Sequence, residues 1–306
     1  MKGIARYAIA MATISSLSLI VNCGEKQLIE IDGSSTVYPI TAAVAEEFRG
    51  VNSDVHVTVG ISGTGGGFKK FCNGETAISD ASREIKDSER EACAANGVEF
   101  IEFSVAYDGL AVVANKDNDF IDKLTVDQLK KIFEAEPLSA NWSDVSADWP
   151  AEEIKVFAPG QDSGTYDYFK EAILGEEVNM RPDAQYSEDD NVLVIGVAGE
   201  KYAIGFFGLA YYEENADTLK LVPIVNPQTG AAVQPDLETV KSGTYAPLSR
   251  PLFIYVSKKA LERAEVLQFV RFYMEEAAKL SKEVGYIPLE DSIYTNNQSQ
   301  IDAAVN

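Results

Sequence analysis

The stretch DGSSTVYPITAAVAEEF, from Asp32 to Phe48, joins small hydroxylated residues to a run of apolar residues at helical spacing. Helix N-termini leave backbone N–H groups unpaired and carry a partial positive charge, so they bind anions readily. Two interpretations are open. Either Ser34 or Ser35 is an ordinary N-cap of this helix, or the Gly-Ser-Ser-Thr segment is built to hold an anion. The rest of the chain has to decide between them.

Two more segments combine a strand end, a turn rich in Gly, Ser and Thr, and a following helix pattern. They are Ser62–Gly67, in GISGTGGGFKKF, and Asp162–Thr165, in APGQDSGTYDYF. Neither fits the GxxxxGK[ST] pattern, so a P-loop is excluded. Glycine lets the backbone approach a ligand closely, and hydroxyl groups both donate and accept hydrogen bonds. Three such turns in one chain predict N–H groups that converge on one anion.

Strand and helix patterns alternate along the chain, which favours an α/β fold. The length of 306 residues favours about two domains. A natural N-cap at Thr125 begins one amphipathic helix pattern, and another covers 261–283. The expected strands are 28–31, 55–59, 76–79, 109–114, 154–157, 203–206, 219–225 and 252–256.

The chain is strongly acidic, with 26 Lys and Arg against 48 Asp and Glu and a formal charge of −22. No basic patch is visible, which argues against a nucleic-acid partner and against docking on anionic lipid. A small anion is still compatible, because local dipoles and one arginine outweigh a distant, screened net charge.

The N-terminus has the pattern of an export signal. Lys2 and Arg6 precede the apolar, uncharged segment 8–21, which is too short for a comfortable membrane span. We expect residues 1–22 to be a signal peptide. Cys23 then resembles the lipidated cysteine of bacterial lipoproteins, although Asn22 stands where Gly, Ala or Ser is usual. The expected location is the periplasm or cell envelope with a lipid anchor, and plain secretion is the alternative.

Cys72 and Cys93 are the other two cysteines. Once Cys23 is set aside, two cysteines are left, and in an exported chain this even number suggests one disulfide. Two buried free thiols are the alternative. No Cys/His cluster is present, so no metal site is expected.

Together these segments resemble the periplasmic phosphate-binding proteins of bacterial high-affinity phosphate ABC transporters. The matching segments are GSSTVYP (33–39), SGTGGGF (62–68), SDASREIKDSE (79–89), YDGLAVVAN (107–115), LTVDQLKKIF (124–133) and DSGTYDYF (162–169). The resemblance implies two α/β lobes of the type II-like binding-protein fold, joined by two crossings with phosphate in the cleft. We expect lobe 1 at 23–114 and 248–306 and lobe 2 at 115–247. It further implies delivery of phosphate to ABC permease membrane subunits, no cofactor and no catalysis. We expect a monomer.

The resemblance also implies a set of phosphate-binding residues that offer hydroxyl groups, backbone N–H groups and charge: Ser35, Thr36, Ser62, Asp80, Arg83, Ser163, Gly164 and Thr165. Some members carry an arginine four residues before the serine of the SGT segment, and here Pro159 stands at that position. Other members carry it after the aspartate, which Arg83 fits. Asp162 is a candidate partner that orients Arg83. The alternative is that Arg83 is an ordinary surface charge.

Asp80 is the most informative member of this set. A carboxylate that faces an anion is costly unless a proton lies between them, and phosphate carries such a proton whereas sulfate does not. A site built around that hydrogen bond can reject the anion that lacks the proton by a factor of about 10⁴–10⁵. The alternative is an ordinary turn residue at the end of a strand.

Other functions fit less well. A serine hydrolase needs a base, and the only histidine, His56, lies in an expected strand with no GxSxG segment in the chain. One histidine is also too few for a metal-dependent phosphatase. Trp142 and Trp149 are expected to be packing residues. The alternatives that stay open are a binding protein for another tetrahedral oxyanion and a phosphate sensor that signals instead of transporting.

Overall fold

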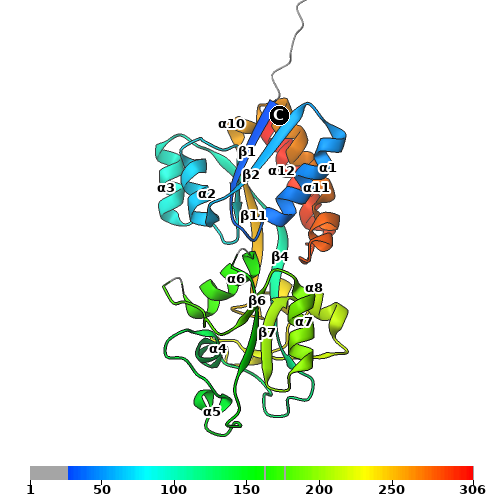
Figure 1. The fold of residues 1–306 in the computed structure, drawn as a ribbon. Coiled ribbons are helices and arrows are strands. Elements are labelled where there is room, and N and C mark those ends of the chain that lie inside the picture. The colour runs from blue at the N-terminus through cyan, green and yellow to red at the C-terminus, as the bar shows by residue number, and fades with distance from the viewer. Residues whose placement is uncertain (1–26, 162, 176, 306) are drawn as a thin grey trace, which may run out of the picture.

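One continuous sheet runs through both lobes of the molecule (Figure 1). The computed structural model describes residues 27–161, 163–175 and 177–305. The expected signal peptide, Cys23 and Asp162 lie outside these residues. The sheet has nine strands in the order β2-β1-β3-β11-β4-β7-β5-β6, with β8 paired to β4, and β9 and β10 form a separate pair.

The strands are β1 (Gln27–Gly33), β2 (Val55–Ile61), β3 (Ile78–Ala81), β4 (Phe100–Asn115), β5 (Lys155–Pro159), β6 (Gln185–Ser187), β7 (Ala203–Gly208), β8 (Leu219–Leu221), β9 (Ile224–Val225), β10 (Ala232–Val233) and β11 (Ser249–Ser257). The helices are α1 (Tyr38–Val51), α2 (Gly63–Cys72), α3 (Asp87–Ala95), α4 (Val126–Phe133), α5 (Trp142–Val145), α6 (Gly164–Phe169) with the π-helical turn η1 (Lys170–Leu174), α7 (Asp190–Gly199), α8 (Leu209–Asn215), α9 (Leu237–Lys241), α10 (Lys258–Leu261), α11 (Ala264–Glu283) and α12 (Asp291–Val305). None of the described helices is long and apolar enough to span a membrane.

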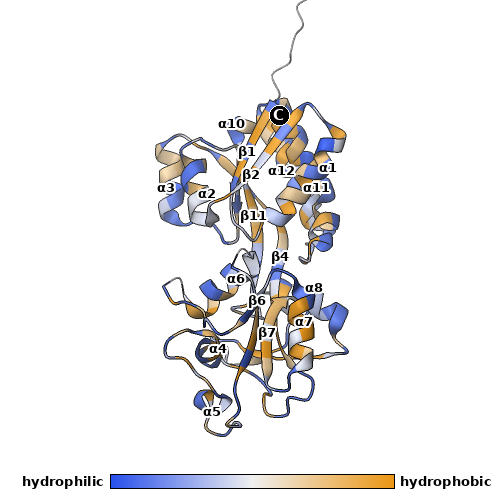
Figure 2. Cartoon of the chain, viewed as in Figure 1, coloured by the Kyte–Doolittle hydropathy of each residue, from blue (hydrophilic) through white to orange (hydrophobic). Residues whose placement is uncertain are grey.

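Lobe 1 is built on the parallel strands β1, β2 and β3, with β11 antiparallel to β3. Helices α1, α11 and α12 lie on one face and α2 and α3 on the other (Figure 1). Apolar residues of β1, β11 and α11 meet in its main core, and Figure 2 shows the strands as largely apolar. Residues of α2, α3 and β11 form a smaller core that includes both cysteines.

Lobe 2 has its own core around β4, β5 and β7. Trp142 is fully buried and its ring packs on Phe120 and Trp149, with ring centroids 5.2 Å and 5.8 Å away. The prediction that both tryptophans are packing residues is confirmed. Thr125 also caps α4 as expected, because its side chain accepts a hydrogen bond from the Gln128 N–H.

The two lobes are connected by neighbouring antiparallel strands. β4 pairs with β11 as far as Gly109, and from Leu110 it pairs with β7 of lobe 2. The register between β4 and β11 shifts by one residue beside Leu252, which marks a β-bulge near the junction. The α/β fold and the two-lobe architecture expected from the sequence are both confirmed.

Two expected elements differ in detail. The glycine run lies inside α2 and not in a turn before it. A Cβ at Gly67 would sit 2.5 Å from the Gly33 Cα. Glycine therefore lets α2 pack directly on β1. The single strand expected at 219–225 is divided into β8 and β9, since Pro223 has no N–H to continue the ladder.

Candidate anion-binding site

A cavity of about 440 Å³ lies where the two lobes meet. Its walls come from the loop after β1, the start of α2, the segment after β3, the segment α6–η1 and the strand β11. The residues that line it are Ser34, Ser35, Thr36, Gly63, Thr64, Gly65, Ser82, Arg83, Lys86, Glu89, Asp167, Tyr168, Lys170, Glu171 and Arg250.

The segment Ser34–Thr36 is a turn that precedes the helix. Helix α1 begins at Tyr38, its N-cap residue is Val37, and no side chain caps it. The Ser34 Oγ instead accepts a hydrogen bond from the Thr36 N–H at 3.2 Å. The interpretation of Ser34 or Ser35 as an ordinary N-cap is therefore wrong, because both residues lie in the turn that precedes the N-cap residue Val37.

This turn touches lobe 2 directly. The Thr36 hydroxyl donates to the Gly164 carbonyl at 3.2 Å, and the Ser35 hydroxyl donates to the Asp167 carboxylate at 2.8 Å. A Cβ at Gly164 would lie 2.6 Å from the Thr36 Cα. Only glycine allows the start of α6 to come this close, so the lobes meet at this point.

Ser163 is the N-cap of α6 and accepts a hydrogen bond from the Thr165 N–H at 3.2 Å. The third predicted turn is thus a capped helix start that faces lobe 1. Ser163, Gly164 and Thr165 stand next to the cavity but not among its lining residues.

Ser62 does not line the cavity either. Its hydroxyl donates to the Asp32 carboxylate, which also accepts from Lys70 at 2.6 Å. The hydroxyl that reaches the cavity from this loop belongs to Thr64, which lies 3.1 Å from the Ser82 hydroxyl. The role of Ser62 in binding stays a prediction.

Asp80 is fully buried behind the Ser34–Thr36 turn, and its carbonyl accepts from the Ser34 N–H at 3.0 Å. Neither of its carboxyl oxygens has a hydrogen-bond partner of good geometry among the described residues. Burial raises the pKa of Asp80 to about 8, and the nearby charge of Asp32 adds to this although the Thr41 hydroxyl opposes it. The carboxyl group is therefore protonated at about neutral pH.

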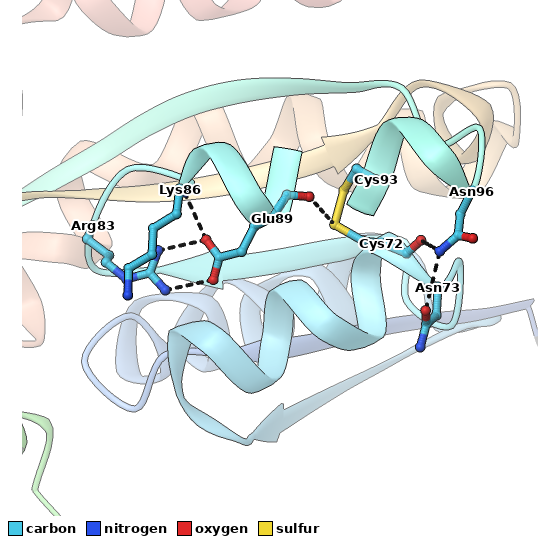
Figure 3. Close-up of a disulfide and its surroundings, with 7 residues drawn as sticks. All are labelled: Cys72, Asn73, Arg83, Lys86, Glu89, Cys93 and Asn96. Carbon is cyan, nitrogen blue, oxygen red and sulfur yellow. Dashed lines mark hydrogen bonds and ion pairs between the residues drawn. A yellow bond between two sulfur atoms is a disulfide. The ribbon is translucent and has the colours of Figure 1, made fainter. Parts of the chain in front are cut away.

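Arg83 lies in the cavity wall. Its guanidinium forms two hydrogen bonds of 2.8 Å with the Glu89 carboxylate (Figure 3). It also donates to the Glu84 carbonyl at 3.0 Å. The pKa of Arg83 is raised, mainly by its hydrogen bonds to Glu89. The candidate partner Asp162 lies outside the described residues, and Glu89 orients this arginine.

The sequence analysis missed Arg250, a second arginine in the cavity wall. Its Nη2 donates to the Thr36 hydroxyl at 2.8 Å, and its Nε lies 3.4 Å from a carboxylate oxygen of the buried Asp108. The guanidinium stacks 3.5 Å from the ring centroid of Tyr168 in lobe 2. It was missed because no small-residue turn marks it in the sequence. An arginine at the start of a buried, apolar strand was the one available signal.

The cavity concentrates positive charge in an acidic protein. Arg83, Lys86, Lys170 and Arg250 line it, and three carboxylates stand among them. Both arginines already contact carboxylates, so they are held in place before any ligand arrives. The arrangement offers guanidinium N–H groups and a hydroxyl of the Thr64–Ser82 pair to an anion, while the Ser35 and Thr36 hydroxyls donate to lobe 2. The residues described contain no group of His, Cys, Asp and Glu that could hold a metal ion, and the exposed His56 lies outside the cavity on β2.

Comparison with known proteins identifies the family. The model of the PBP superfamily domain matches residues 21–277. The protein SphX of Synechococcus elongatus is 52% identical over 273 residues, which cover 89% of this chain and 80% of that protein. The phosphate-binding protein PstS of Staphylococcus saprophyticus is 42% identical over 272 residues, covering 89% and 83%. The chain belongs to this family of phosphate-binding proteins.

A solved member of the family has the same fold. The crystal structure of a possible phosphate binding protein from Planctomyces limnophilus superposes with a TM-score of 0.89 at 45% identity, covering 92% of this chain and 99% of that one. An ABC-type phosphate transport receptor from Vibrio cholerae gives 0.65 at 26% identity, covering 85% and 100%. The chain is therefore a member of the family of substrate-binding transport proteins that the sequence motifs indicated.

Proposed function

We propose that this protein binds inorganic phosphate between its lobes and delivers it to the membrane subunits of an ABC permease. The observation that carries the proposal is the position of the Thr36 hydroxyl. It lies 2.8 Å from the Arg250 guanidinium and 3.2 Å from the Gly164 carbonyl, so a hydroxyl, a cation and a helix start from both lobes meet at one point. The names of the relatives, PstS and ABC-type phosphate transport receptor, support the same function.

The proposed binding set keeps every residue expected from the sequence and adds Arg250. Hydroxyl and N–H groups of both lobes donate to the phosphate oxygens, the two arginines neutralise its charge, and Asp80 shares a proton with it. The set is Ser35, Thr36, Ser62, Asp80, Arg83, Ser163, Gly164, Thr165 and Arg250.

Asp80 gives the site a pH-dependent choice between anions. A hydrogen bond between the Asp80 carboxyl group and a bound oxyanion needs one proton. Below the Asp80 pKa of about 8, the carboxyl group itself provides that proton. Above that pH Asp80 ionises, and only an anion that carries its own proton avoids two facing acceptors. Phosphate keeps a proton in this range and sulfate has none. Discrimination against sulfate therefore increases as the pH rises through about 8.

Calorimetry on the ligand-stripped mature protein tests the function. We expect tight binding of phosphate, binding of the isosteric arsenate, and sulfate binding that disappears as the pH is raised from about 6 to about 9. The variant Asp80→Asn should bind sulfate without this pH dependence, because its amide has no proton to lose. Absence of phosphate binding would refute the function, and pH-independent rejection of sulfate would refute the role of Asp80.

The route to the membrane is part of the same proposal. Residues 1–22 direct export, Cys23 carries a lipid, and the mature monomer stays at the cell envelope beside its permease. The lobe boundaries at 114/115 and 247/248 are those of the sequence analysis. Intact-mass analysis of protein from its native envelope tests the anchor, and a phosphate-uptake assay with the gene deleted separates transport from sensing.

A further inference from the structure

Among the described residues, hydrogen-bond partners leave one edge of the Arg83 guanidinium free. Arginine has five N–H donors. Glu89 takes one hydrogen from Nη1 and one from Nη2, and the Glu84 carbonyl takes the second hydrogen of Nη1. The two donors that remain are Nε–H and the second Nη2–H. They lie side by side on one edge, which matches two oxygens of a tetrahedral anion.

This free edge lies at the cavity. A Cβ at Gly65 would be 3.9 Å from Nη2, and Gly65 itself lines the cavity at the start of α2. The ring of Phe68 lies under the guanidinium, 5.6 Å from its central carbon. Glu89 and the ring therefore restrain the group from two directions, so a shift of Glu89 would turn the free edge away.

Glu89 is itself fixed on both sides. Its carboxylate accepts from the Lys86 N–H at 2.9 Å as well as from Arg83 (Figure 3). Burial raises the pKa of this group, but the hydrogen bonds from Arg83 and Lys86 outweigh that effect, so the pKa of Glu89 is lowered and the group stays ionised. An ionised partner keeps both hydrogen bonds to Arg83 at full strength.

The disulfide between Cys72 and Cys93 connects this arrangement to α2. It joins the end of α2 to α3, which carries Glu89. The Cys72 Sγ touches the Glu89 carbonyl oxygen at 3.4 Å, and this is a contact without a hydrogen because the sulfur is in a disulfide. The Asn96 side chain also donates to the Cys72 carbonyl at 2.9 Å. The prediction of a disulfide is confirmed, and the bond braces the helix that positions Arg83.

We propose that Glu89 is a positioning residue for anion binding, and that the Cys72–Cys93 disulfide makes its position, and hence the affinity for phosphate, dependent on the redox state of the protein. The proposal rests on the proposed function and adds a residue outside the binding set. Glu89 acts through Arg83 alone. Its removal therefore weakens binding only while Arg83 is present.

A double-mutant cycle tests this dependence. Calorimetry with inorganic phosphate compares the full mature protein with Glu89→Gln, Arg83→Ala and the double variant. We expect Glu89→Gln to weaken phosphate binding about tenfold and to have no further effect in the Arg83→Ala background. Glu91→Gln is the matched control, because Glu91 is exposed on the same helix, and it should leave the affinity unchanged.

Two outcomes would overturn the inference, and a third would overturn the proposed function instead. Equal losses from Glu89→Gln with and without Arg83 would mean that Glu89 supports the fold only. Tighter binding by Glu89→Gln would mean that it competes with the anion for Arg83. If the unmodified protein binds no phosphate, the proposed function itself fails, which is a separate result.

The redox part has its own experiment. Phosphate affinity is measured for the unmodified protein and for Glu89→Gln before and after an added dithiol reduces the Cys72–Cys93 bond to two thiols and is itself oxidised to a disulfide. Circular dichroism confirms that both proteins remain folded. We expect reduction to weaken binding several-fold in the unmodified protein and much less in Glu89→Gln, because that variant has already lost the position of Arg83. An equal loss of phosphate affinity in both proteins, or no loss in either, would contradict the proposal that the disulfide holds Glu89 in position.

Discussion

Lobe 1 and lobe 2 bring different chemistry to the same cavity. Lobe 1 contributes a fixed cation, Arg83, to the cavity wall, and it holds a buried carboxyl group, Asp80, behind the Ser34–Thr36 turn and outside the lining residues. Lobe 2 contributes Asp167, which accepts from Ser35, and next to the cavity its capped start of α6 places Gly164 against the Thr36 turn. Under the proposed function, lobe 1 would recognise the charge and the protonation of the anion. Lobe 2 would supply the close backbone contact between Gly164 and Thr36 that forms only when the lobes are closed.

Removing Arg250 should have the largest effect, because this residue serves both lobes. Arg250→Ala leaves Asp108 buried beside no cation and removes the partner of Thr36. Breaking a buried pair in this way costs about 3–5 kcal/mol of folding free energy. Chemical denaturation should show that loss and calorimetry should show a large drop in phosphate affinity. Arg49→Ala is the control, since the Arg49 side chain is 66% exposed in its pair with Glu46. Equal unfolding free energies of the two variants would mean that Arg250 does not stabilise the contact between the lobes.

The burial of Asp80 predicts a pH dependence of stability that originates in lobe 1. The pKa of Asp80 is about 8 in the folded protein and near the ordinary aspartate value of 3.8 in the unfolded chain. The contribution of the neutral group is complete below the lower value and is lost as the pH rises to the higher one. In ligand-free protein the free energy of unfolding should therefore fall by about 1.4 kcal/mol for each pH unit within that window.

Asp80→Asn should lack this slope, whatever its absolute stability, because the amide does not titrate. The measurement is the difference in unfolding free energy between the two proteins at several pH values, so that all other titrating groups cancel. Parallel curves would mean that Asp80 is ionised in the folded protein at neutral pH. The proton-sharing role would then be lost.

A methyl group at Gly164 tests the contribution of lobe 2. Gly164→Ala would place its Cβ 2.6 Å from the Thr36 Cα and hold the lobes apart. We expect a loss of about 1–3 kcal/mol in phosphate binding, the usual cost of overpacking, with a smaller change in unfolding stability. Gly50→Ala is the control, because a Cβ at Gly50 would meet nothing within 4 Å. Small-angle scattering of Gly164→Ala with phosphate should show a larger radius of gyration than the unmodified protein shows, and identical radii would contradict the contact.

The sequence predicted local secondary structure well, but it predicted poorly which side chains face the cavity and which distant residues contact one another. The strands around the Ser34–Thr36 turn and the cap at Thr125 follow from short-range patterns, so they could be read directly. In the glycine run the sequence could not show whether Ser62 or Thr64 faces the cavity, because glycine leaves the start of α2 undefined. Arg250 could not be found because its contact with Thr36 joins positions 214 residues apart.

The pairing of β4 with β11 also limits how the lobes can move. Both connections between the lobes are neighbouring strands held by one ladder of hydrogen bonds, with a bulge beside Leu252 and the Val105 carbonyl tied to the Tyr294 hydroxyl at 2.7 Å. Sliding one strand along the other would break that ladder, whereas bending and twisting the two-stranded ribbon would not. We therefore expect the lobes to move relative to each other mainly by rotation about this two-stranded ribbon. A rotation of this kind gives a membrane partner one well-defined shape for each state of the cleft.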